Sequence, residues 1–86
     1  MRTFRCNEHW QAIDPARNIA RDYQITATTD LFGWIIVERR WGRIGGKGRV
    51  TRASFADADA AERFVARIKA RRASAPRRIG AAYRPV

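Results

Sequence analysis

The residues best suited to chemistry lie in one stretch near the middle of the chain, and they fit the binding of phosphate groups. Trp41-Gly42-Arg43 follows a β-branched run and precedes a glycine-rich turn around Lys47. An aromatic ring, backbone N–H groups exposed by glycine and guanidinium forks together suit a partner that carries phosphates. No acid lies among the basic residues of this stretch, which are Arg39, Arg40, Arg43, Lys47, Arg49 and Arg52. The alternative is a β-hairpin whose ordinary solvent face carries arginine.

The glycine turn does not fit the nucleotide-binding motifs. A P-loop needs a glycine five residues before the glycine of its Gly-Lys pair and a hydroxyl residue after the lysine. Trp41 and Gly48 occupy those two positions here, and Thr51 stands where the dinucleotide fingerprint needs its third glycine. We therefore expect no nucleotide cofactor. The turn is predicted to reverse the chain tightly and to place Lys47 and Arg49 at its rim.

No catalytic or metal site is predicted. His9 and Cys6 are the only histidine and the only cysteine, and two ligands fall short of the four that structural zinc takes. Three residues apart on one strand, they point to opposite faces and cannot act together in nucleophilic catalysis. We expect a binding protein without enzymatic activity, metal or small-molecule substrate.

Strands must hold the central stretch, and alternating residues predict four of them. A first strand is expected over 2–13, a second over 23–28, a third from Trp34 through the central motif, and a fourth over 49–55. Residues 17–22 are predicted to form an irregular connection, because no apolar stripe supports a helix there.

One helix is predicted over about residues 57–72. Asp57 fits the N-cap position, and acids precede basic residues along the helix, as its dipole favours. The apolar residues that follow recur at helical spacing, at Ala61, Phe64, Val65 and Ile68. The expected fold class is therefore α+β, a small twisted antiparallel sheet of about four strands with one helix packed across it.

Length and charge limit the organisation and the partners. The 86 residues are expected to form a single domain over 1–86, in which 74–86 is a basic C-terminal tail that can pair briefly with the sheet at Tyr83. Lysine and arginine number 18 against 8 acids, and fourteen of the 18 lie from Arg39 onward, with three acids. Such confined positive charge indicates a polyanionic partner. Nucleic acid is the first candidate and an anionic membrane surface the second.

The predicted cellular location rests on the absence of a signal peptide and of a membrane-spanning segment from the sequence. No apolar stretch of a signal peptide follows Met1, and the longest glycine-free apolar run, 34–37, is far shorter than the roughly 20 residues of a membrane span. A single cysteine suits a reducing compartment. We expect a soluble cytoplasmic protein that has no membrane partner.

The central motif resembles the signature of a known family. Trp41–Gly45, directly after an aromatic and β-branched strand, is similar to the WGR domain, a module of DNA-dependent poly(ADP-ribose) polymerases that also occurs as short bacterial proteins. Asp14–Tyr23, Asp30–Trp34 and Glu62–Phe64 resemble its bacterial branch. The resemblance spans roughly residues 14–70, most of the chain.

The resemblance implies DNA binding with a preference for ends, nicks or other breaks. In the relatives the motif tryptophan packs on the terminal sugar or base and the motif arginine reaches the adjoining backbone, and these roles map to Trp41 and Arg43. The resemblance also places Asn18 and Tyr23 near the DNA-facing side; the alternative is a turn-stabilising Asn and a core Tyr. Other residues assigned to the DNA-binding set are Gly42, Arg39, Lys47, Arg49 and Arg52.

Two other functions stay open. In the polymerases the motif arginine also faces a neighbouring domain, so a version of the module without that domain could be a protein-docking module for a partner enzyme. Structured RNA is the other possible ligand, because charge alone does not separate it from DNA. The polymerases carry ADP-ribosyl transfer in a separate domain, which agrees with a non-catalytic chain.

Trp41 lies where two kinds of surface meet. Alternation places it on the face of Ile35 and Val37, which favours a core position. Arg39 and Arg43 share that face, and a core would not hold two unpaired guanidiniums. We therefore predict that this face is buried at Ile35 and Val37 and open by Trp41.

Overall fold

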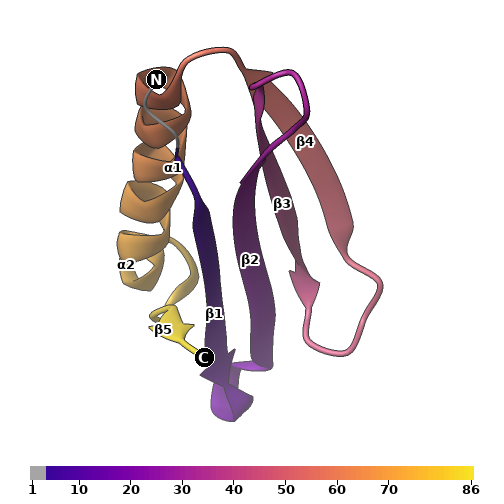
Figure 1. Ribbon diagram of the computed structural model, residues 1–86. Coiled ribbons are helices and arrows are strands. Elements are labelled where there is room, and N and C mark those ends of the chain that lie inside the picture. Colours follow the sequence, from indigo (N-terminus) through magenta and orange to yellow (C-terminus); the bar gives the residue numbers. More distant parts are fainter. Residues whose placement is uncertain (1–3) are drawn as a thin grey trace.

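An antiparallel sheet and one long helix make up the fold (Figure 1). The computed structural model describes residues 4–86, and for residues 78 and 79 it describes the backbone alone. The elements in chain order are β1 (Cys6–Asp14), the 3-10 turn η1 (Pro15–Arg17), β2 (Ile19–Thr29), β3 (Ile35–Arg43), β4 (Arg49–Phe55), α1 (Ala58–Ala73), α2 (Ala75–Ile79) and β5 (Arg84–Pro85). The α+β class is confirmed.

The sheet has five strands in the order β4-β3-β2-β1-β5, one more than the approximate count of four. All neighbouring strands are antiparallel, and residues directly opposite in such a pair share a face. Alternate residues of β2 and β3 form the buried face, with Ile25 at its centre. Polar side chains such as Gln24 and Thr26 lie on the opposite face.

Helix α1 covers the apolar face, as its periodicity predicts. The Asp57 carboxylate accepts a hydrogen bond from the Asp59 N–H at 2.9 Å, so the N-cap is confirmed. Phe64 packs on Phe55 of β4, with ring centroids 5.1 Å apart. The helix residues buried in the core are Ala58, Ala61, Val65 and Ile68. The predicted helix is therefore correct to within one residue at each end.

The second strand begins earlier than predicted. It starts at Ile19, which pairs with Asp14 of β1, while Arg21 pairs with Arg43 of β3. The prediction of an irregular 17–22 connection is wrong for residues 19–22, because backbone pairing on two sides stabilises a strand without an apolar pattern. In the first strand, β1 begins at Cys6, and residues 2 and 3 lie outside the described part of the chain.

The segment after α1 is more ordered than the predicted tail with brief sheet pairing at Tyr83. It forms α2, whose first residue, Ala75, is fully buried, and then β5, which pairs with β1 at Trp10 and Gln11. The Val86 N–H also donates to the His9 carbonyl at 3.0 Å. The free edge of β1 explains the difference, since its unpaired backbone groups bind the end of the chain.

Different loops and elements lie at the two ends of the sheet. Figure 1 shows η1, the β3–β4 loop and β5 at one end, and the β2–β3 turn with the start of α1 at the other. The described residues extend over 48 × 24 × 17 Å. Among them, no helix combines the length and the apolar character that crossing a membrane requires.

Candidate nucleic-acid interface

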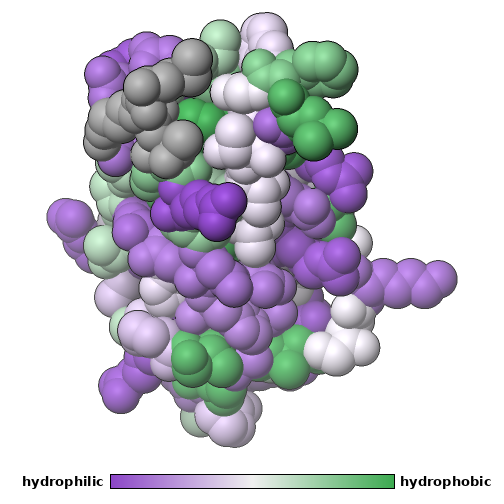
Figure 2. Space-filling view, in the orientation of Figure 1, coloured by the Kyte–Doolittle hydropathy of each residue, from purple (hydrophilic) through white to green (hydrophobic). Residues whose placement is uncertain are grey.

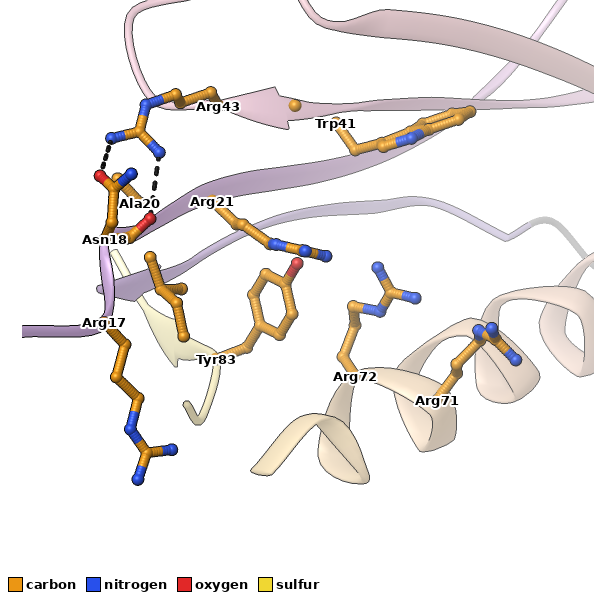
Figure 3. Close-up of a pocket in the computed structure, with 11 residues that line it drawn as sticks. Arg17, Asn18, Ala20, Arg21, Trp41, Arg43, Arg71, Arg72 and Tyr83 are labelled. Carbon is orange, nitrogen blue, oxygen red and sulfur yellow. Dashed lines mark hydrogen bonds between the residues drawn. The ribbon is translucent and has the colours of Figure 1, made fainter. Parts of the chain in front are cut away.

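A cavity of about 630 Å³ lies at the end of the sheet where η1, the end of β3 and the last turn of α1 meet (Figure 3). Two of its lining side chains, Trp41 and Tyr83, are large aromatics, and none is acidic. Five of its lining residues are arginines, namely Arg17, Arg21, Arg43, Arg71 and Arg72. This density of guanidinium groups produces a strongly positive potential inside a concave surface.

Strand register places Trp41 in the cavity wall. Trp10, Tyr23 and Trp41 are directly opposite one another on β1, β2 and β3. The Tyr23 and Trp41 rings stack with centroids 6.2 Å apart and an interplanar angle of 23°. Tyr23 is only 3% exposed. This burial favours the core position over a position on the DNA-facing side. Trp41 lies above it, half-buried, with part of its ring open to the cavity.

The face of β3 changes character along the strand, as predicted. Ile35 and Val37 are 2% and 1% exposed, whereas Trp41 is half-buried and Arg43 is exposed. Ile35 and Val37 belong to the core that α1 covers, whereas Trp41 is only partly buried against that core. The result is an aromatic ring with one side supported by the core and a rim of guanidiniums around it.

Asn18 fixes the direction of the motif arginine. One terminal nitrogen of Arg43 donates to the Asn18 side-chain oxygen at 2.9 Å, and the other donates to the Asn18 carbonyl at 3.3 Å (Figure 3). Asn18 follows η1 in the left-handed conformation, φ 55°, which asparagine tolerates better than most residues. Because asparagine is neutral, it orients the guanidinium without cancelling its charge.

Arg72 is a cavity residue that the sequence did not single out. Its guanidinium carbon lies 4.2 Å from the Tyr23 ring centroid and 5.3 Å from that of Tyr83, a geometry that stabilises the cation. Its Nε atom is buried and has no hydrogen-bond partner among the described residues. From the sequence, the basic residues at the helix end, Arg71 and Arg72 among them, are explained by the helix dipole and by unspecific attraction to nucleic acid, and a place in a defined cavity is not predicted for them.

Three other residues of the predicted set lie beside the cavity. The Arg39 guanidinium carbon is 5.5 Å from the Trp41 ring centroid, and Arg39 Nε donates to Thr51 at 3.3 Å. Arg49 is directly opposite Trp41 on β4 and is exposed. Lys47 is exposed in the β3–β4 loop. Together they extend the positive surface from the cavity toward β4.

Arg52 is the member of the predicted set that the structure places elsewhere. It is opposite Glu38, and both side chains lie on the sheet face away from α1. Arg52 Nε is 3.3 Å from a Glu38 carboxylate oxygen. Counting charges along the sequence could not show this, because the face of each residue depends on the register.

Gly42 of the central motif is required by a close backbone approach. A Cβ atom added there would lie 2.6 Å from the Gly48 Cα, on the returning side of the hairpin. We expect Gly42→Ala to lower the free energy of unfolding by about 1–3 kcal/mol, because two backbone segments must separate. Thermal melts of the purified chain would measure the loss.

Gly45→Ala is the matched control for this prediction. Gly45 is in the same loop and has φ +81°, but an added Cβ would meet nothing within 4 Å. Gly45→Ala therefore places an alanine in the left-handed conformation, which lowers stability, but it causes no clash with the backbone. Equal melting temperatures for the two variants would show that close packing at Gly42 is unimportant.

The histidine and the cysteine lie outside the cavity. His9 Nε2 is hydrogen-bonded to the Asp22 carboxylate, to which Gln11 also donates at 3.2 Å. Partial burial and the nearby Glu8 carboxylate raise the pKa of the Cys6 thiol, which keeps it protonated and weakly nucleophilic. In the described part of the chain, no three of His, Cys, Asp and Glu are grouped to hold a metal ion.

Comparison with known proteins identifies the family of the chain. The WGR domain family matches residues 7–76, a range that contains every cavity residue except Tyr83. The chain is 39% identical over 70 residues to "Uncharacterized protein y4dW" of Sinorhizobium fredii, in a match that covers 78% of this chain and 34% of that protein. It thus spans about a third of the length of that relative. No solved structure gives a significant match. The chain belongs to the WGR domain family, a family of nucleic-acid-binding modules.

Proposed function

We propose that the chain is a non-catalytic DNA-binding module that prefers ends, nicks or other breaks. The observation that carries the proposal is the cavity, in which five arginines and no acid surround the half-buried ring of Trp41. Guanidinium forks bind phosphate oxygens in pairs, and an aromatic ring stacks on a base or sugar. The family of binding modules to which the chain belongs supports the same reading.

The shape of the site favours a terminus over a continuous duplex. An intact duplex presents phosphates on its outside and keeps its bases stacked, so it can use the arginines but not the ring. At an end or a nick, the last nucleotide has an uncovered face, which can enter the cavity and stack on Trp41. Arg43, held in place by Asn18, then contacts the adjoining backbone, and Lys47 and Arg49 contact phosphates further along.

The lining side chains support binding without catalysis. The functional groups they supply are guanidinium, amide, indole and phenol. None of the described residues that line the cavity is a histidine, cysteine, serine or carboxylate, which are the usual bases and nucleophiles. The lining therefore supplies cations that bind phosphate groups.

The function is tested by titrating the whole chain with three duplexes of equal sequence and with a matched RNA. The duplexes are blunt-ended, nicked and closed-circular, each measured at two salt concentrations. We expect the blunt and nicked duplexes to bind more tightly than the circle. Equal affinity for all three would refute the preference for breaks, tighter binding of the RNA would favour an RNA-binding function, and no binding at low salt would favour the protein-docking alternative.

Arg43 and Arg52 form a matched pair for testing the site. Arg43→Ala removes an oriented fork at the cavity and should weaken binding of blunt and nicked duplexes about tenfold, as loss of a charge-assisted hydrogen bond does. Closed circles should lose less. Arg52→Ala removes the same charge from the opposite face of the sheet and should change neither by more than about twofold.

The comparison is made by fluorescence anisotropy at one fixed salt concentration. Circular dichroism would check that both variants keep the fold. If the two substitutions weaken the binding of ends equally, Arg43 contributes only a positive charge, and the geometry of the cavity does not matter.

A further inference from the structure

The turn between β2 and β3 exposes two large apolar side chains at the end of the sheet opposite the cavity. Leu31 is 99% exposed and Phe32 is 87% exposed, and Trp34 beside them is also exposed. Figure 2 shows a hydrophobic patch at the place of this turn, and other hydrophobic side chains at the opposite end of the same face. We call Leu31 and Phe32 the apolar tip. Side chains this exposed contribute almost nothing to the core, so the fold does not explain them.

Hydrogen bonds hold the apolar tip in one conformation. One Asp30 carboxylate oxygen accepts from the backbone N–H groups of Phe32 and Trp34, both at 2.9 Å. The Asp30 N–H donates to the Trp34 carbonyl at 2.9 Å, and Gly33 supplies a left-handed residue with φ +84°. A surface that is already ordered pays little conformational entropy when it binds. The turn therefore holds the Leu31 and Phe32 side chains in a fixed, exposed position.

The charges near the apolar tip differ in sign from those of the cavity. Ile35 pairs with Phe55, which brings the start of α1 to the same end of the sheet. The turn 30–34, the connection 56–57 and the first turn of α1 carry three acids, Asp30, Asp57 and Asp59, and Arg5, directly before β1, is a basic residue at the same end. The other end carries Arg17, Arg43 and Lys47 and one described acid beside them, Asp14, whose carboxylate lies 3.7 Å from Arg17 Nε. An anionic membrane or nucleic acid is therefore disfavoured at the apolar tip.

We propose that the apolar tip inserts into an apolar pocket on a protein partner whose pocket is rimmed by basic residues. A convex pair of anchors needs a concave apolar surface, and the three aspartates around it complement a positive rim. This inference does not depend on the proposed function.

The position of the apolar tip leaves the cavity free. Strand β3 separates the two ends, and its nine residues at about 3.3 Å each make roughly 30 Å. A protein bound at the apolar tip and a nucleic acid bound at the cavity would not collide at this distance. The domain would then join the two partners.

The test begins with site-specific photocrosslinking. A benzophenone amino acid replaces Phe32 in the whole chain, expressed in the cells that naturally produce it, and Val86, exposed at the other end, is replaced in a control. A protein crosslinked from position 32 and not from position 86 is identified and purified. Calorimetry then measures its affinity for the chain.

Two double variants decide the outcome. Leu31→Ser with Phe32→Ser should weaken binding of the purified partner by about tenfold or more, as loss of two anchors does, while blunt-duplex binding stays unchanged. Ile13→Ser with Val86→Ser removes two other exposed apolar side chains and should leave the partner's affinity unchanged.

Several results would overturn the proposal. One is the absence of a crosslink specific to position 32, and another is equal affinity of the partner for both double variants. A third is a crosslink only to a second copy of the chain. The last is binding to phosphatidylcholine–phosphatidylglycerol vesicles that the Leu31/Phe32 double variant abolishes, which would assign the apolar tip to a membrane.

Discussion

Trp41→Ala is expected to lower both the stability of the chain and its affinity for DNA ends. The ring stacks on Tyr23 and borders Arg39. Because Trp41 is only half-buried, its loss should reduce the free energy of unfolding by about 2–4 kcal/mol, somewhat less than the roughly 3–5 kcal/mol for truncation of a buried aromatic residue. For a domain of this size that lowers the melting temperature by roughly 10–20 °C without unfolding it at low temperature. Binding of blunt and nicked duplexes should fall roughly tenfold to a hundredfold, because base stacking is lost.

Two tryptophan controls separate these effects. Trp41→Phe keeps an aromatic ring and should recover much of both losses. Trp34→Ala removes an exposed tryptophan at the opposite end of the sheet and should leave end binding nearly unchanged. Melts and titrations below the melting temperature of each variant would measure both quantities. A folded Trp41→Ala variant that binds ends normally would eliminate the stacking role.

Affinity for duplex DNA is expected to fall about a hundredfold or more between about 50 and 200 mM salt. Each phosphate neutralised by a cation contributes a slope of about −0.9 in the logarithm of affinity against the logarithm of salt concentration. The five cavity arginines with Lys47 and Arg49 provide enough cations for about four to six such contacts. A fourfold rise in salt then accounts for the loss.

The slope is measured by anisotropy titrations at four or more salt concentrations with the blunt duplex. Arg21→Ala, which removes one cavity arginine, should make the slope shallower by about one unit. Arg52→Ala, on the opposite face, serves as the control and should leave it unchanged. A nearly flat profile for the unaltered chain would contradict nucleic-acid binding and favour docking on a protein.

The sequence predicted the fold class and most elements because those features are local. The apolar stripe of α1 and the Asp57 cap lie within about three turns of helix, and the β4 strand matched its predicted range of 49–55. Local patterns failed where pairing partners decide the structure. Residues 19–22 form a strand because β1 and β3 flank them, and β5 forms because β1 has a free edge.

The residues of the site also fall into two groups, those that the sequence predicts and those that only the tertiary structure brings together. The sequence alone determined the motif Trp41-Gly42-Arg43, the excess of basic residues and the change from buried to open along β3, since each depends on residue type and alternation. The tertiary structure decided which cations surround the ring. It added cavity residues that lie far apart in the chain, namely Arg17, Arg21, Arg71, Arg72 and Tyr83, and it placed Arg52 on the other face. Strand register and the point at which α1 ends fix those positions, and both result from long-range packing that no short stretch of sequence encodes.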